Sequence, residues 1–163
     1  MTVANILKEL KGVYANDQAA PDADIQDTIS DDIITIPMLL DTAAGTDFTY
    51  GSFKVPFAFQ VVDVSVQPGA ALTAADATAN TYTLGKADGA GGASTVVASF
   101  TSATVGGSGS GNWVADVFVP ATLSAVAGAT LVARGQIVTW KKTHLSTGTV
   151  TPASTCTLKI RRV

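Results

Sequence analysis

His144 is the one histidine in the 163-residue chain, so any Ser–His–Asp or Cys–His system would have to use it. It lies in the polar segment 141–148, where two neighbouring lysines disfavour a positive charge on its ring. This segment contains no carboxylate that could orient the imidazole. We therefore interpret His144 as an ordinary loop residue and expect no catalysis from it.

Cys156 is the only cysteine, so the chain cannot form an internal disulfide. One cysteine and one histidine also exclude a structural zinc site. Cys156, Leu158 and Ile160 alternate with polar residues, as in a strand with one apolar face. The spacing predicts that the Cys156 sulfur is a small buried apolar group and not a nucleophile.

Asp22, Asp24 and Asp27 have a spacing that superficially fits calcium, which prefers oxygen ligands. The segment lacks the glycine and the final glutamate of an EF-hand loop. Our main interpretation is a solvated linker, and a weak calcium site in this acidic segment is the alternative.

Paired carboxylates for glycoside chemistry would have to come from aspartates such as Asp63, Asp76 or Asp116. Asp63 alternates with valines and faces away from an apolar layer, whereas Asp116 falls within a predicted strand and would pair with a basic neighbour. None of the three has a second acid close by, and the glycine runs lack a phosphate-binding motif. We expect neither enzymatic activity nor a bound cofactor.

The composition favours strands and turns. Charged residues make up 14% of the chain, against about 25% in an average soluble protein. Glu9 is the only glutamate, while β-branched residues are abundant. Much of the surface must then be small and uncharged, which suits packing against other protein. The alternative is an ordinary β-domain with an uncharged surface.

About eight strands are predicted from apolar alternation and turn signals, which indicates an antiparallel all-β sandwich or barrel. The segments are 33–36, 46–55, 57–66, 78–86, 94–100, 113–119, 130–133 with 136–141 (a pair, or one strand bent at Gly135), and 154–163. Pro37 marks the first segment as a strand end or an edge strand. The apolar phase shifts between Val61 and Val62, as in a β-bulge or a strand buried on both faces.

Two further local features are expected between these strands. Residues 121–127 predict one helical turn that ends at Gly128. The glycine-rich segments 87–92 and 106–111 predict mobile loops that share one end of the sandwich.

The N-terminal residues differ from the rest. Residues 2–14 predict a short amphipathic helix, whose apolar stripe consists of Val3, Ile6, Leu7, Leu10 and Val13. Residues 15–32 predict an extended acidic connector. The expected organisation is an arm at 1–32 and a β-sandwich at 33–163. No membrane-spanning run or signal peptide is apparent, so we expect a protein that is used without secretion.

The formal net charge of −3 conceals an asymmetry. Every charged residue from Asp17 to Asp47 is acidic, and every charged residue from Arg134 onward is basic. Such tracts pair within a subunit or between subunits, unless their arrangement is coincidental. The negative net charge and the lack of a known motif argue against nucleic-acid binding.

Four segments resemble small structural proteins of tailed bacteriophages: Phe53-Lys54-Val55-Pro56-Phe57, Asn80-Thr81-Tyr82-Thr83-Leu84-Gly85, Arg134-Gly135-Gln136-Ile137-Val138 and Thr157-Leu158-Lys159-Ile160-Arg161-Arg162. The chain from Phe53 onward is similar to jelly-roll capsid decoration (cement) proteins. This resemblance implies a homotrimer on the virion surface, made in the host cytoplasm, that clamps neighbouring major capsid protein subunits. It implies no membrane partner.

The residues expected to contact other subunits are Ile6, Leu7, Leu10, Asp22, Asp24, Asp27, Lys141, Lys142, Arg161 and Arg162. An acidic arm with an apolar end can reach a neighbouring subunit and add contact area when it becomes ordered. The alternative function is a receptor- or glycan-binding module of a head fibre or tail. A small jelly-roll enzyme is disfavoured by the scarcity of His, Cys and Glu.

Overall fold

The computed structural model describes residues 31–40, 44–90, 93–105 and 107–163. The predicted helix at 2–14 and the acidic connector therefore lie outside the described residues, apart from the start of the first strand. Residues Asp32–Val163 form one compact unit.

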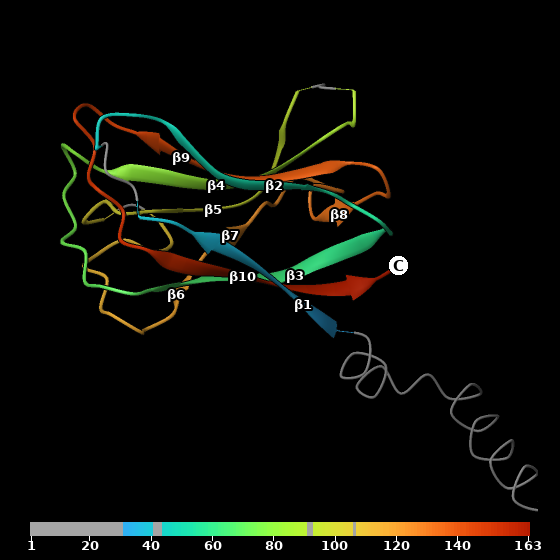
Figure 1. The fold of residues 1–163 in the computed structure, drawn as a ribbon, viewed down its shortest axis with the longest axis horizontal. Helices are drawn as coiled ribbons and strands as arrows, with labels where there is room; N and C mark the ends of the chain where they lie inside the picture. The colour runs from blue at the N-terminus through green and yellow to red at the C-terminus, as the bar shows by residue number, and fades with distance from the viewer. Residues whose placement is uncertain (1–30, 41–43, 91–92, 106) are drawn as a thin grey trace, which may run out of the picture. The chain divides into compact units, whose positions relative to one another are not determined.

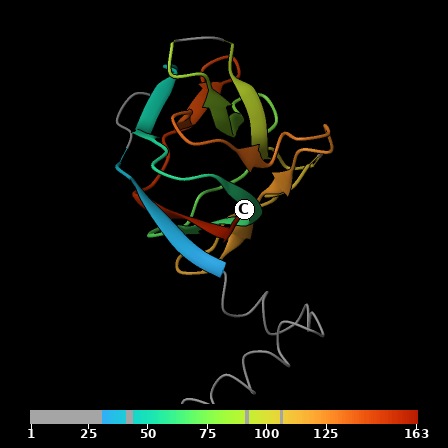
Figure 2. The same cartoon turned by 90° about the vertical axis from the view of Figure 1, so that its right-hand side faces the viewer.

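This unit consists of two antiparallel five-stranded sheets that face each other as a β-sandwich (Figures 1 and 2). The first sheet has the order β1-β10-β3-β6, with β8 also paired to β3, and the second has the order β2-β9-β4-β5-β7. The strands are β1 (Asp31–Met38), β2 (Phe48–Lys54), β3 (Phe59–Pro68), β4 (Asn80–Ala87), β5 (Thr95–Thr101), β6 (Val119–Pro120), β7 (Thr122–Leu123), β8 (Leu131–Val132), β9 (Ile137–His144) and β10 (Ser154–Arg162). No helix occurs in the described part of the chain, and the all-β prediction is confirmed.

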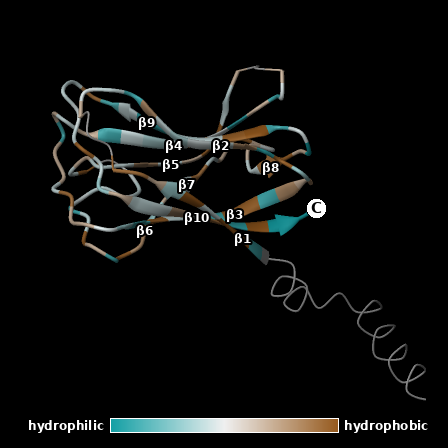
Figure 3. Ribbon diagram, viewed as in Figure 1, coloured by the Kyte–Doolittle hydropathy of each residue, from teal (hydrophilic) through white to brown (hydrophobic). Residues whose placement is uncertain are grey.

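The core lies between the two sheets, where alternate residues of the longer strands are buried. Figure 3 shows apolar residues distributed along the strands of both sheets. Aromatic rings fill its centre. The rings of Tyr82 and Phe100 stack with their centroids 4.6 Å apart, and Phe100 stacks on Trp140 at 5.5 Å. Trp113 packs against the same group. Such contacts hold the sheets together through buried apolar area and ring geometry.

The predicted β-bulge is present in β3. Lys159 of β10 is paired with Asp63 and Ile160 with Val61, so Val62 is the extra residue. Because of this insertion, Val61 and Val64 both point into the core although they are three positions apart. The prediction of an edge position at Pro37 is also confirmed, since β1 is the outermost strand of the first sheet.

The predicted strand at 113–119 is wrong in most of its length. Trp113 forms only an isolated bridge with Leu72, and Asp116 adopts a left-handed conformation with φ of 62°. A left-handed residue interrupts extended backbone, so the chain turns and only Val119–Pro120 pairs with β3. The apolar residues of this segment predict a strand, but most of the segment pairs with no neighbouring strand.

The prediction for 121–133 is corrected as well. No helical turn forms at 121–127. This segment contains the short strand β7, which pairs with β5, and the chain then turns at Gly128, where φ is 73°. The segments on either side of Gly135 are neither a pair nor one bent strand. β8 belongs to the first sheet and β9 to the second, because Gly135 (φ 88°) turns the chain from one sheet to the other.

The glycine-rich segments do not share one end of the sandwich. Residues 88–90 precede β5 and residues 107–111 follow it, so they lie at opposite ends of that strand (Figure 1). An antiparallel hairpin makes this unavoidable, since each successive turn falls at the alternate end of the sheet.

Candidate functional site

His144 ends β9 and has the carboxylate partner that its sequence neighbours lack. Its Nδ1 lies 2.8 Å from Oδ1 of Asp47, and its backbone N–H donates to the same oxygen at 3.1 Å. These hydrogen bonds, first from the backbone and then from the side chain of His144, lower the pKa of Asp47. The expectation of no orienting carboxylate is therefore wrong, because the partner lies 97 residues earlier in the chain.

The Asp47–His144 pair has the geometry that orients an imidazole, but catalysis also requires a nucleophile within hydrogen-bond reach. Among the described residues, no serine, threonine or cysteine side chain hydrogen-bonds to the imidazole. The pair instead fastens the segment before β2 to the end of β9.

Cys156 lies in β10 with its side chain fully buried in the core. The prediction that its sulfur faces the apolar layer is confirmed. Burial raises the pKa of the Cys156 thiol to about 12, so the reactive thiolate is scarce at neutral pH. This environment suits a packing role.

The two adjacent lysines of β9 have different environments. Lys141 is exposed, whereas Lys142 is only 1% exposed and its Nζ donates to the carbonyl of Ala44 at 3.3 Å. The prediction of Lys142 as a subunit contact is wrong, because alternation turns this side chain toward the core side of the sheet. Trp140 is buried as expected. Lys141 remains available on the outer face of the second sheet.

Arg161 and Arg162 lie at the C-terminal end of β10 in the first sheet. The Nε of Arg162 donates to Oδ2 of Asp32 at 2.7 Å, and its guanidinium lies 4.4 Å from the centre of the Phe57 ring. The acidic and basic tracts thus meet within the chain at Asp32–Arg162. Arg161 and Arg162 lie on the other sheet from Lys141 and do not form one patch with it.

The other predicted contact residues, namely Ile6, Leu7, Leu10, Asp22, Asp24 and Asp27, lie outside the described residues. This also applies to the alternative calcium site. Within the described ranges, no group of three or more His, Cys, Asp or Glu side chains could hold a metal ion.

The three aspartates considered for acid–base chemistry have separate environments. Asp63 is exposed on the outer face of β3, as predicted. Asp76 accepts hydrogen bonds from the side chain and the backbone of Thr104, which lower its pKa. Asp116 lies in a turn, so the expected pairing from a strand position is wrong. Asp63 and Asp116 line different surface hollows, and no carboxylate pair is formed.

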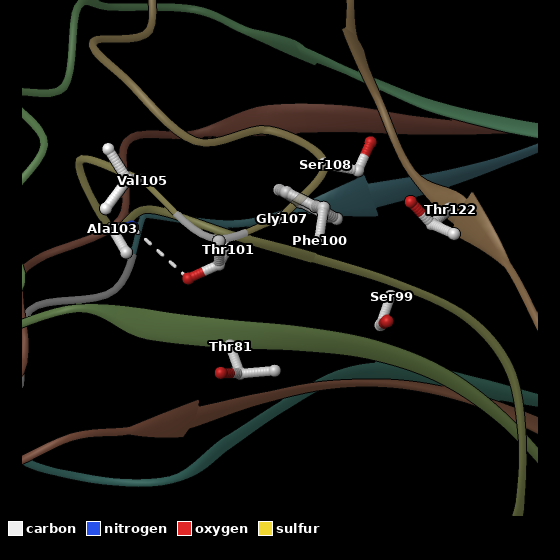
Figure 4. Close-up of a pocket in the computed structure, with 9 residues that line it drawn as sticks. All are labelled: Thr81, Ser99, Phe100, Thr101, Ala103, Val105, Gly107, Ser108 and Thr122. Atoms are coloured by element: carbon white, nitrogen blue, oxygen red, sulfur yellow. Dashed lines mark hydrogen bonds between the residues drawn. The ribbon is translucent and has the colours of Figure 1, made fainter.

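A hollow of about 430 Å³ lies on the outer face of the second sheet (Figure 4). It is lined by five hydroxyl side chains, which are those of Thr81, Ser99, Thr101, Ser108 and Thr122. The Ser108 hydroxyl donates to the carbonyl of Pro120 at 2.6 Å, and the Thr101 hydroxyl accepts from the N–H of Ala103 at 3.2 Å. None of the described residues that line this hollow is charged. It was not predicted, because its residues come from three strands and a loop.

A second hollow of about 520 Å³ lies on the outer face of the first sheet. We call it the first-sheet hollow, and it is lined by Ile33, Asp63, Ser65, Phe118, Pro120, Thr157 and Lys159. Ile33 and Phe118 are large apolar side chains that are 70% and 57% exposed, while Asp63 and Lys159 supply one charge of each sign. The exposure of Phe118 was not predicted, because a regular strand at 113–119 does not contain the turn at Asp116 that precedes it.

Comparisons with protein-family models, curated proteins and solved structures find no match to this chain. Among the residues that the structure describes, no helix is both long enough and apolar enough to span a bilayer.

Proposed function

We propose that this chain is a structural subunit of a virus particle, a capsid decoration protein that bridges major capsid protein subunits of a tailed bacteriophage. Its place is the outer surface of the virion, after synthesis in the host cytoplasm. The proposal includes a jelly-roll-like course for the sandwich and no catalytic step. The proposal is based on the resemblance of the chain from Phe53 onward to capsid decoration proteins.

The observation that carries the proposal is the exterior of the sandwich. Large apolar side chains are strongly exposed on β1 and on connecting segments, including Val105 at 72%, Ile33 at 70%, Val126 at 67% and Phe118 at 57%. Charged residues are few at the same time, at 14% of the chain. A protein that works as a free monomer usually has a more charged exterior and smaller apolar patches. A surface of this kind supports function inside an assembly.

The proposed mechanism is clamping by many copies. Each subunit makes modest contacts through its uncharged faces, and a contact held at high effective concentration on a lattice gains strength from its neighbours. The residues with clear chemistry fit a passive role. His144 and Arg162 join segments of the sandwich, and Cys156 is buried.

The test is binding to capsids that lack this protein. We expect purified chain to co-sediment with such capsids at a fixed ratio and to raise their resistance to heat or osmotic shock. A chain without residues 1–30 should bind more weakly if the arm contributes to the clamp. Absence of binding by the full chain would overturn the proposal. Unchanged binding without residues 1–30 would remove the arm from it.

The resemblance implies three copies in a free assembly. Analytical ultracentrifugation of the full chain measures this number separately from capsid binding. A stable monomer or a dimer would contradict the trimer that the resemblance implies, without affecting the capsid assay.

A second candidate function, recognition of a neutral glycan, is favoured by the hydroxyl-lined hollow. Hydroxyl side chains both donate and accept hydrogen bonds, which suits a polyhydroxylated ligand without charge. Replacement of Thr81 or Thr122 by valine preserves shape and removes the hydroxyl. Loss of binding on a glycan array in these variants, but not in Thr49→Val outside the hollow, would support this function over the first.

A further inference from the structure

We propose that the sheet face around the first-sheet hollow is a self-association surface, and that its partner is the same face of a second copy of this chain. The inference goes beyond the proposed function, which requires no particular contact between copies. It predicts a two-fold dimer in place of the trimer that the resemblance implies.

The arrangement of strands beneath the hollow is compatible with two-fold symmetry. The four strands have the order β1-β10-β3-β6, so β10 and β3 form the middle and β1 and β6 the flanks. Consider a two-fold axis that runs parallel to the strands, above the gap between β10 and β3. This axis places β10 of one copy opposite β3 of the other, and β1 opposite β6. Two antiparallel sheets that pack face to face keep their strands close to parallel in this way.

The charged residues of the hollow are placed opposite residues of the other sign by this two-fold rotation. Asp63 of β3 and Lys159 of β10 are paired residues in the sheet register, and both are exposed on the outer face. The axis places Asp63 of each copy opposite Lys159 of the other. A two-fold interface must be complementary to itself, and one acid and one base on either side of the axis satisfy that requirement.

The apolar side chains of the hollow follow the same pattern. Ile33 lies on β1 and is 70% exposed, while Phe118 lies just before β6 and is 57% exposed. The two flanks exchange across the axis, so the β6 flank of each copy, with Phe118, faces the β1 flank of the other, with Ile33. Burial of exposed phenylalanine and isoleucine side chains in such a contact removes a large apolar area from water, which contributes strongly to protein interfaces. Ser65 and Thr157 add small side chains that allow close approach.

The association constant of the full chain gives the first test. We expect sedimentation velocity over a range of concentrations to show a monomer–dimer equilibrium. Phe118→Ser should weaken the dimer by about tenfold or more, the factor that corresponds to ~1.4 kcal/mol. Val126→Ser is the matched control, because Val126 is 67% exposed and does not line the hollow. Circular dichroism and thermal unfolding verify that each variant is folded.

The second test uses reversal of charge. Asp63→Lys places lysines at both central positions, and Lys159→Asp places aspartates at both. Each variant alone should be mostly monomeric, because like charges then meet across the axis. Equimolar mixing should restore association as a mixed dimer, since each lysine then faces an aspartate. Any disturbance inside one chain persists after mixing, so recovery identifies a contact between chains.

Three outcomes would overturn the inference. They are a full chain that stays monomeric at every concentration, association that Phe118→Ser does not weaken relative to Val126→Ser, and charge-reversed variants that fail to associate when mixed. Capsid binding by a monomeric chain would retain the proposed function while removing this surface. Dimerisation without capsid binding would do the opposite.

Discussion

Asp47 and His144 are joined by two hydrogen bonds to a single carboxylate oxygen, although 97 residues separate them in the chain. One bond comes from the backbone of His144 and the other from its ring. The pair fastens the segment that precedes β2 to the last residue of β9.

This pair predicts a specific loss of stability in acid. The bonds from His144 lower the pKa of Asp47 below its ordinary value of 3.8. A carboxylate with a depressed folded-state pKa stabilises the fold above the unfolded value and loses that contribution as the pH falls through the folded value. The difference in melting temperature between the native chain and Asp47→Asn should therefore shrink as the pH falls below 3.8.

Asp88→Asn is a suitable control for this effect, because Asp88 is exposed and makes one long side-chain contact with Gln136 at 3.3 Å. It should change the melting temperature little at any pH. A difference for Asp47→Asn that stays the same in strong acid would show that the carboxylate charge is not involved.

A second prediction concerns Gly148, which packs against the same segment. It has a φ of 63°, and an added Cβ would collide with the carbonyl of Ala44 and come within 2.8 Å of the Cβ of His144. Gly128 has a similar φ of 73° but nothing within 4 Å of an added Cβ. Gly128→Ala should cost about 1–2 kcal/mol of backbone strain. Gly148→Ala should lower the free energy of unfolding, measured in urea, clearly more than Gly128→Ala does. Equal losses in the two variants would show that the collision with Ala44 and His144 contributes nothing.

The features that could be predicted from the sequence are those whose cause is local. The change of apolar phase at Val62 indicated a bulge, and Pro37 indicated an edge, because each residue constrains its own strand. The alternation around Cys156 predicted a buried thiol for the same reason. In these places the residues of a single strand are sufficient to predict its local structure.

The features that could not be predicted depend on distant partners. The carboxylate beside His144 and the carbonyl beside Lys142 come from a segment about a hundred residues earlier, as the separations of 97 and 98 show. The segment at 113–119 has apolar residues suited to a strand, but the turn at Asp116 ends the regular course. Both hollows also combine residues from several strands, and only the register of the sheets brings these together.

A third prediction tests the polar group buried at one end of the core. The hydroxyl of Tyr82 lies 2.8 Å from the Thr151 hydroxyl and accepts from the Asn80 side chain at 3.2 Å. Asn80 also donates to the carbonyl of Thr149, which ties the segment before β10 to β4. Tyr82→Phe keeps the ring and leaves these buried groups without one partner. We expect a loss of about 1–3 kcal/mol in the free energy of unfolding.

Thr151→Val removes the second hydroxyl of the Tyr82–Thr151 hydrogen bond and completes a double-mutant cycle with Tyr82→Phe. The double variant should lose less than the sum of the two single losses, since residues in one hydrogen-bond network couple to each other. Strictly additive losses would contradict a direct bond between the two hydroxyls.

The last prediction concerns the reactivity of Cys156. Its side chain is fully buried and its thiol pKa is raised to about 12, so both access and thiolate formation oppose attack on a disulfide reagent. We expect slow labelling by such a reagent in native buffer and fast labelling in denaturant. Thr49→Cys adds an exposed thiol on β2 and should label at once in the same native sample. The slow phase should then accelerate with urea in step with unfolding, because the sulfur becomes accessible only when the sheets separate. Fast native labelling of Cys156 would show that β10 opens without unfolding of the sandwich.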